Sequence, residues 1–130
     1  MENKILQSRV GPVANIIFNQ PEKRNAVSLE MWTAVNEAIN ILATDQSVRV
    51  LMLSGAGGKS FVSGADISKF ESERASKEAV AEYNQMTKKV YDSVANFPKP
   101  TIAQIDGFCI GGGVGSVSYT HLTLPTMDSV

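Results

Sequence analysis

The sequence predicts an α/β fold, and three observations support this prediction. Residues 48–55, VRVLMLSG, are mostly apolar and end in glycine, which is typical of a strand buried on both faces of a parallel sheet. Two longer segments carry apolar residues at helical spacing, and they alternate with strand-like segments along the chain. At 130 residues, the chain is long enough for one domain with a substantial core.

The first part of the chain predicts a β-hairpin followed by a loop. KILQSRV at residues 4–10 has the composition of a strand, Gly11 and Pro12 mark a turn, and VANIIF at 13–18 continues as a second strand. Residues 19–25, NQPEKRN, are polar and contain a proline, so we expect a loop there.

Two amphipathic helices and a further strand follow. Ser28 suits the N-cap of a helix that should run to about Ala43, and a longer helix is expected over 76–95, before Pro98. TIAQIDG at 101–107 predicts the next strand. The residues expected on the apolar faces are Met31, Val35, Ala38, Ile39 and Leu42 in the first helix, and Val80, Tyr83, Thr87, Val90, Tyr91 and Val94 in the second.

Composition and charge exclude several classes of partner. The formal net charge is -1 and the chain has no block of Lys or Arg, so we expect neither a nucleic-acid nor a membrane partner. Cys109 is the single cysteine, which rules out an internal disulfide and fits a reducing compartment. The first ten residues lack the apolar core of a signal peptide, and we therefore expect a cytoplasmic protein.

The segment LMLSGAGGKS, at 51–60, has features of a phosphate-binding loop. That motif requires a glycine five positions before its Gly-Lys-Ser step, and Leu53 stands there instead. The residues that follow, 61–66, also lack helical character. A flexible surface loop after a strand is therefore favoured, while a nucleotide-binding module using GAGGKS stays open as an alternative function, as does a non-catalytic interaction fragment.

Two further glycine-bearing segments are candidate sites. In FVSGADISKF, at 61–70, Gly64 would allow the backbone to approach a ligand closely, or would make a tight turn. In GFCIGGGVG, at 107–115, three successive glycines open a predicted helix, although each glycine inside a helix costs roughly 1 kcal/mol relative to alanine. Such a helix start favours bare N–H groups facing negative charge, with close packing against a neighbouring helix as the alternative.

The order of these motifs resembles the crotonase (enoyl-CoA hydratase/isomerase) superfamily. The resemblance rests on NQPEKRNAVSLEMW at 19–32, FVSGADI at 61–67, and KPTIAQIDGFCIGGG at 99–113, and it extends over about residues 5–115. It implies the ββα spiral core of the ClpP/crotonase fold, truncated at the C-terminus, with residues 1–115 as a partial crotonase domain.

The resemblance also implies a substrate class and a catalytic device. Members of the superfamily bind acyl-CoA thioesters and stabilise an enolate-like oxyanion with two backbone N–H groups. By position, these donors would be the N–H groups of Ala65 and Gly112. Coenzyme A would enter as part of the substrate, so no separate cofactor and no metal are expected.

Six residues match positions that lie beside coenzyme A in the family. Lys23 and Arg24 could meet phosphates through charge, or could equally be solvated loop cations. Asp66 is expected to cap the following turn rather than to act as an acid. The residues expected at coenzyme A are Glu22, Lys23, Arg24, Ser63, Gly64 and Asp66.

One position departs from the family pattern. Hydratases of the superfamily carry a catalytic Glu three residues after the oxyanion glycine, and this chain has Gly115 there, which offers no acid or base. The sequence therefore does not select among hydration, isomerisation, hydrolysis and decarboxylation.

The last segment, 116–130, does not continue the predicted helix. VSYTHLTLPT, at 117–126, can be encoded by DNA that resembles the transposon end and adapter used to prepare DNA for sequencing. We therefore expect a non-native tail in which His121 has no function, in preference to a surface hairpin or strand or a catalytic base at His121. On this interpretation the chain is an N-terminal fragment, inactive and marginally stable, of a parent that forms homotrimers or hexamers.

Overall fold

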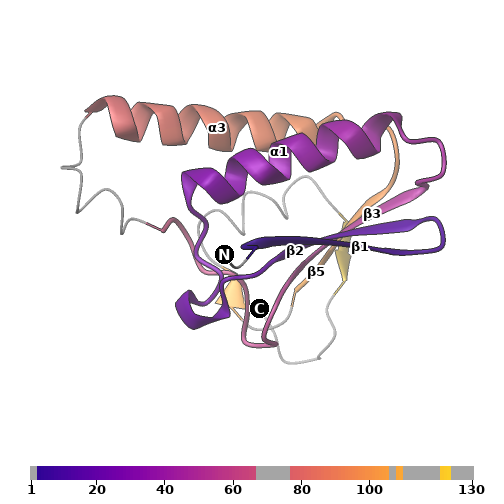
Figure 1. Cartoon of the computed structure of the whole chain (residues 1–130), viewed down its shortest axis with the longest axis horizontal. Coiled ribbons are helices and arrows are strands. Elements are labelled where there is room, and N and C mark those ends of the chain that lie inside the picture. Colours follow the sequence, from indigo (N-terminus) through magenta and orange to yellow (C-terminus); the bar gives the residue numbers. More distant parts are fainter. Residues whose placement is uncertain (1–2, 67–76, 106–107, 110–120, 124–130) are drawn as a thin grey trace.

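A five-stranded sheet carries two helices on one of its faces (Figure 1). In this computed structural model, the structure describes residues 3–66, 77–105, 108–109 and 121–123. The strands, in their order across the sheet, are β1 (Ile5–Val10), β2 (Val13–Phe18), β3 (Val50–Gly55), β5 (Thr101–Gln104) and β7 (His121–Thr123). The β1–β2 pair is antiparallel and the other pairs are parallel, which confirms the predicted α/β class.

The predicted hairpin is present, with Val10 paired to Val13 across its turn. Gly11 occupies the turn with a φ of 57°, in the left-handed region that glycine adopts without steric cost. In β2 the residues alternate between half-buried and buried, so Ile16 and Phe18 point to the core. The hairpin therefore gives the sheet its edge strand and its first row of core side chains.

Strand β3 is covered fully on one face only, which corrects the expectation of burial on both. Leu51 and Leu53 are buried, whereas Val50 and Met52 are half-buried. Figure 1 gives the reason, because both helices lie against the same face of the sheet.

Helix α1 (Leu29–Thr44) begins at the predicted N-cap. The Ser28 hydroxyl accepts a hydrogen bond from the N–H of Met31, at 3.2 Å, which satisfies one amide that the first helical turn leaves without a partner. Trp32 is 1% exposed, and its ring meets Phe18 and Tyr91 edge-on. The five apolar positions predicted for this helix are all buried.

Helix α3 (Lys77–Ala95) runs alongside α1 in the same direction (Figure 1). Tyr83, Val90 and Val94 are buried as predicted, but Val80 is 39% exposed. Val80 lies in the first turn of α3. The start of α3 projects beyond the start of α1 (Figure 1), so α1 does not cover that turn. No helix among the described residues combines the length and apolar character needed to cross a membrane.

Shorter elements complete the described chain. The predicted loop at 19–25 contains a 3-10 helix, η1 (Pro21–Lys23), and β4 (Ser60–Val62) pairs in parallel with β6 (Phe108–Cys109). Strand β5 ends at Gln104, earlier than predicted. Strand β7 falls within the stretch expected to be a non-native tail, and the origin of that tail stays a prediction.

The end of α1 is tied to the hairpin through Asp45. Its carboxylate accepts hydrogen bonds from the N–H and the hydroxyl of Ser47 and pairs with Arg9 of β1. These contacts lower the pKa of Asp45 from its ordinary value of 3.8 to about 2, and the Ser47 hydroxyl contributes most. Lys99 donates to the carbonyl oxygens of Leu42 and Asp45, so it supplies hydrogen bonds to carbonyl groups at the C-terminal end of α1.

Because the pKa of Asp45 is depressed in the folded chain, its contribution to stability is present above pH 3.8 and is lost as the pH falls through about 2. We expect urea midpoints, followed by Trp32 fluorescence, to fall over this interval. Ser47→Ala should make the loss smaller and end it at a higher pH, because the folded-state pKa moves back toward 3.8, and Asp45→Asn should flatten it. An Asp45→Asn chain with the same acid sensitivity as the parent chain would contradict this assignment.

Candidate active site

The candidate site lies where strands β2 and β3 end. Because these strands are parallel, their carboxyl ends meet at one edge of the sheet, and the segments that leave them, 19–27 and 55–66, lie side by side. Open α/β sheets bind ligands at this edge. Five of the eight residues expected at the site from the sequence lie in the second segment or contact it.

Asn25 joins the two segments. Its side chain is fully buried, and its Nδ2 donates to the carbonyl oxygens of Ala56, at 2.9 Å, and Ser60, at 2.8 Å. Its Oδ1 accepts from the N–H of Gln20, at 2.8 Å. All the principal groups of the amide are therefore paired, as burial requires. Asn25 also has a φ of 59°, a left-handed conformation that asparagine tolerates better than most residues.

Two glycines of the GAGGKS loop allow the 55–66 segment to pack closely against the 19–27 segment. A Cβ on Gly55 would lie 2.3 Å from the carbonyl oxygen of Ser60 and 2.7 Å from Nδ2 of Asn25. A Cβ on Gly57 would lie 2.8 Å from the side chain of Pro21, and Gly57 has a φ of 90°. The absence of side chains therefore lets the two loops approach each other.

The same geometry argues against the nucleotide-binding alternative. A phosphate loop must lead into a helix and leave its Ser hydroxyl accessible to a magnesium ion. Here the loop leads into strand β4, and Ser60, its first residue, is 1% exposed. Packing against the 19–25 loop explains the glycines without a phosphate.

An isolated parallel bridge pairs Val27 with Ala65. The N–H of Val27 donates to the carbonyl oxygen of Gly64, and the N–H of Asp66 donates to the carbonyl oxygen of Val27, both at 2.9 Å. In a parallel bridge of this kind, the N–H of the middle residue points away from the partner strand. The N–H of Ala65 makes none of the hydrogen bonds found in the described part of the chain, and Ala65 is exposed.

Gly64 shapes the backbone just before this N–H. Its φ of 136° is one that residues with a side chain rarely adopt. No atom of the described residues lies within 4 Å of the position where a Cβ would sit, so the requirement is conformational and the space beside Gly64 is open.

The carboxylate of Asp66 is buried, with 7% of its side chain exposed. It accepts a hydrogen bond from Nε2 of Gln20, at 3.0 Å, and lies 3.5 Å from the ammonium group of Lys23. Lys23 is thus paired with a buried carboxylate, while 46% of its side chain stays exposed to solvent. Gln20, which the sequence did not single out, is 1% exposed, and it also donates to the carbonyl oxygen of Ala26, at 2.6 Å.

The remaining predicted residues surround this pair. The Ser63 hydroxyl donates to the carbonyl oxygen of Lys23, at 3.3 Å, so Ser63 helps hold η1 against β4. Glu22 of η1 and Arg24, which follows η1, are exposed, and Arg24 has a φ of 53°. Gly112, the second expected donor, and Gly115 lie outside the described residues.

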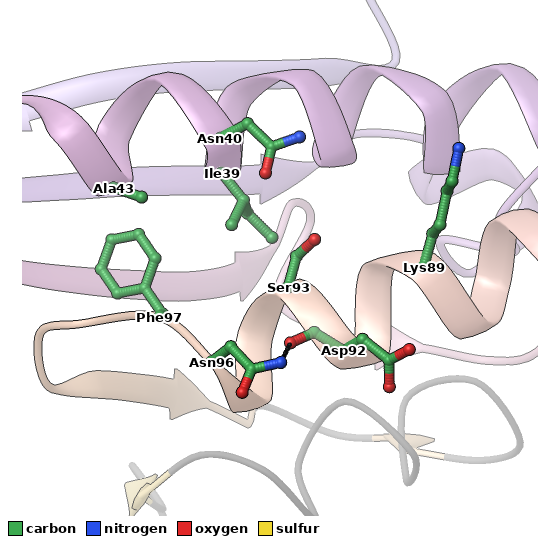
Figure 2. A pocket seen from close by; sticks show the side chains of 8 residues that line it. All are labelled: Ile39, Asn40, Ala43, Lys89, Asp92, Ser93, Asn96 and Phe97. Atoms are coloured by element: carbon green, nitrogen blue, oxygen red, sulfur yellow. Dashed lines mark hydrogen bonds between the residues drawn. The ribbon is translucent and has the colours of Figure 1, made fainter.

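A pocket of about 330 Å³ lies elsewhere, between the C-terminal parts of α1 and α3 (Figure 2). Figure 2 shows Phe97 and Ile39 at its apolar side, with Lys89 and Asp92 at its polar side. It shares no residue with the candidate site. Within the described ranges, no group of three or more His, Cys, Asp or Glu residues could hold a metal ion.

Solved structures share the fold of this chain. An enoyl-CoA hydratase/carnithine racemase from Magnetospirillum magneticum matches with a TM-score of 0.84 at 34% identity, over 96% of this chain and 50% of that one. An enoyl-CoA hydratase/isomerase family protein from Hyphomonas neptunium matches with a TM-score of 0.86 at 32% identity, over 94% and 47%. The fold is therefore that of the crotonase class.

Sequence comparison is more specific. The family model described as enoyl-CoA hydratase/isomerase matches residues 13–130, and the chain belongs to this family. Mouse enoyl-CoA hydratase domain-containing protein 2, mitochondrial, is 37% identical over 84% of this chain, and the crotonyl-CoA hydratase of Syntrophomonas wolfei is 34% identical over 86%. The chain spans 37% and 42% of the length of these two relatives.

The hydrogen bonds of Asn25 predict a large loss of stability when its side chain is replaced by that of alanine. Asn25→Ala would leave a buried N–H and two carbonyl oxygens without partners and place alanine in a left-handed conformation, so we expect a loss of about 3 kcal/mol. Urea unfolding followed by Trp32 fluorescence measures this. Asn96→Ala, which removes an exposed side-chain bond to the carbonyl oxygen of Asp92, is the control, with an expected loss below about 0.5 kcal/mol. Equal losses would contradict the proposed role of Asn25.

Alanine substitutions at Gly55 and Gly11 distinguish two reasons for requiring glycine: lack of space for a Cβ at Gly55, and a left-handed φ at Gly11. Gly55→Ala should destabilise the chain by about 3 kcal/mol because its Cβ would overlap backbone atoms that cannot move independently. Gly11→Ala meets no neighbour within 4 Å and should cost about 1 kcal/mol, for its left-handed φ alone. Thermal unfolding of both variants compares them, and a larger loss at Gly11 would refute the close loop packing.

Proposed function

We propose that the site binds an acyl-CoA thioester and that the N–H of Ala65 donates a hydrogen bond to the thioester oxygen. One observation carries the proposal: the bridge to Val27 fixes the backbone on both sides of Ala65 while the N–H of Ala65 itself makes no hydrogen bond within the described chain. An exposed backbone donor held rigidly in this way needs no reorganisation when negative charge develops on an acceptor.

The proposed role of the N–H donors follows from the negative charge that develops on the thioester oxygen during the reaction. Removing a proton next to a thioester carbonyl, or adding a nucleophile across the adjacent double bond, places negative charge on the carbonyl oxygen. Two N–H donors would stabilise that enolate, and Gly112 is the proposed second one. Losing one such donor typically costs roughly 3–4 kcal/mol of transition-state stabilisation.

We propose a hydratase or isomerase reaction for the full-length protein, in keeping with relatives named crotonyl-CoA hydratase and dienoyl-CoA isomerase. The 130-residue chain itself should bind without turnover, because it spans only 37–42% of the length of the mouse and Syntrophomonas wolfei relatives and Gly115 offers no acid or base of its own. Measurable hydration of crotonyl-CoA by this chain would contradict that part of the proposal.

Coenzyme A would lie across η1 and the start of the 63–66 segment. The ammonium group of Lys23 is already paired with Asp66, so its electrostatic attraction to a phosphate is weaker than that of an isolated ammonium group. Arg24 and Glu22 flank it on the exposed side of η1. Ser63 acts mainly by holding η1 in place.

Thioester binding tests the proposal. Calorimetry should give tighter binding of acetoacetyl-CoA than of free CoA, because free CoA lacks the carbonyl oxygen. Ala65→Pro removes the N–H and should weaken acetoacetyl-CoA binding by about tenfold with little effect on free CoA. Ala65→Gly keeps the N–H and serves as the control. Equal affinity of the parent chain for the two ligands would overturn the proposal.

The nucleotide-binding alternative has its own readout. If the GAGGKS loop were a phosphate site, ATP or GTP would raise the melting temperature and CoA compounds would not. We expect a rise with acetoacetyl-CoA and none with ATP beyond that given by an equal concentration of inorganic phosphate.

A further inference from the structure

Tyr83, a buried tyrosine of α3, reaches from the helix layer to the backbone of the candidate site. Its hydroxyl donates to the carbonyl oxygen of Val27, at 2.6 Å, and accepts a hydrogen bond from Nε1 of Trp32, at 2.9 Å. We propose that Tyr83 is a positioning residue that sets the orientation of the Ala65 N–H through Val27. This inference rests on the proposed function.

The carbonyl oxygen of Val27 connects the Tyr83 hydroxyl to the backbone around Ala65. It accepts the N–H of Asp66, which is half of the bridge to Ala65, and it also accepts the Tyr83 hydroxyl. A carbonyl oxygen has two lone pairs, and both are used here. A single bridge of two hydrogen bonds is a weak constraint by itself, so the third bond, made from a packed helix, fixes the plane of the Val27 peptide.

The direction of the Tyr83 proton is also fixed. Trp32 Nε1 can only donate, so the tyrosine oxygen must act as its acceptor and send its single proton to Val27. Val27 and Trp32 are 0% and 1% exposed, and Tyr83 is 8% exposed. Burial raises the pKa of the Tyr83 phenol, which keeps it protonated and donating.

Ser93, a second α3 residue whose hydroxyl reaches α1, provides a matched control. Ser93 donates to Oδ1 of Asn36, at 3.0 Å, and so links the same two helices without touching Val27. Tyr83→Phe and Ser93→Ala each remove one hydroxyl from this helix pair. They differ in whether that hydroxyl reaches the site.

The test compares affinities for acetoacetyl-CoA and free CoA in both variants of the full chain. In Tyr83→Phe, the preference for the thioester should fall by about tenfold while the affinity for free CoA stays unchanged. In Ser93→Ala the preference should stay at the parent value. Lost stability alone would lower both affinities together and leave the preference intact.

The outcomes separate this inference from the proposed function. If the parent chain shows no preference for the thioester, the proposed function fails. If the parent chain shows the preference and Tyr83→Phe keeps it, the positioning role of Tyr83 is overturned and the proposed function stands.

A second measurement covers the case in which Tyr83→Phe does not fold. Replacing Tyr83 with 3,5-difluorotyrosine keeps the ring and hydroxyl and changes the strength of the bond to Val27. In ¹⁵N–¹H spectra of the unliganded chain, the amide resonances of Ala65 and Asp66 should shift while that of Ser93 does not. Unmoved Ala65 and Asp66 resonances would overturn the inference.

Discussion

The buried amide of Asn25 is the interaction on which the candidate site depends. It binds the backbone of three other residues at once and so converts two loops, each of which leaves a separate strand, into one unit. A loop carries little apolar surface with which to hold itself in place, and its backbone polar groups need partners when they are covered. One fully bonded amide meets both needs, at a position closed to bulk solvent.

The functional groups of the resulting site belong to the main chain. Glycines 55 and 57 allow the loops to touch, and Gly64 turns the chain so that the Val27–Ala65 bridge can form. Two charged side chains nearby, those of Lys23 and Asp66, are paired with each other. Such a site offers a directed N–H group rather than a titrating side chain, which suits the stabilisation of an oxyanion more than proton transfer.

Local sequence patterns predicted the secondary structure well and the tertiary contacts poorly. Helix α1, its Ser28 cap and the hairpin follow from spacing and turn residues, since these are contacts between near neighbours in the chain. The single-faced cover of β3 depends on where both helices pack, which periodicity does not reveal. The long-range hydrogen bonds of Asn25 and Tyr83 were missed because their partners lie 31 and 56 positions away, and no short motif records such pairs. Ala65 was identified from the family resemblance. Its N–H makes no hydrogen bond with the described residues, which gives that choice a physical basis independent of the resemblance.

The most direct test of the central claim is a crystal structure of this chain with a bound CoA thioester. The account predicts the thioester oxygen at about 2.7–3.1 Å from the nitrogen of Ala65, with the Val27–Ala65 bridge and the Asn25 contacts intact. A thioester carbonyl bound away from Ala65, or an Ala65 N–H occupied by another part of the chain, would contradict it.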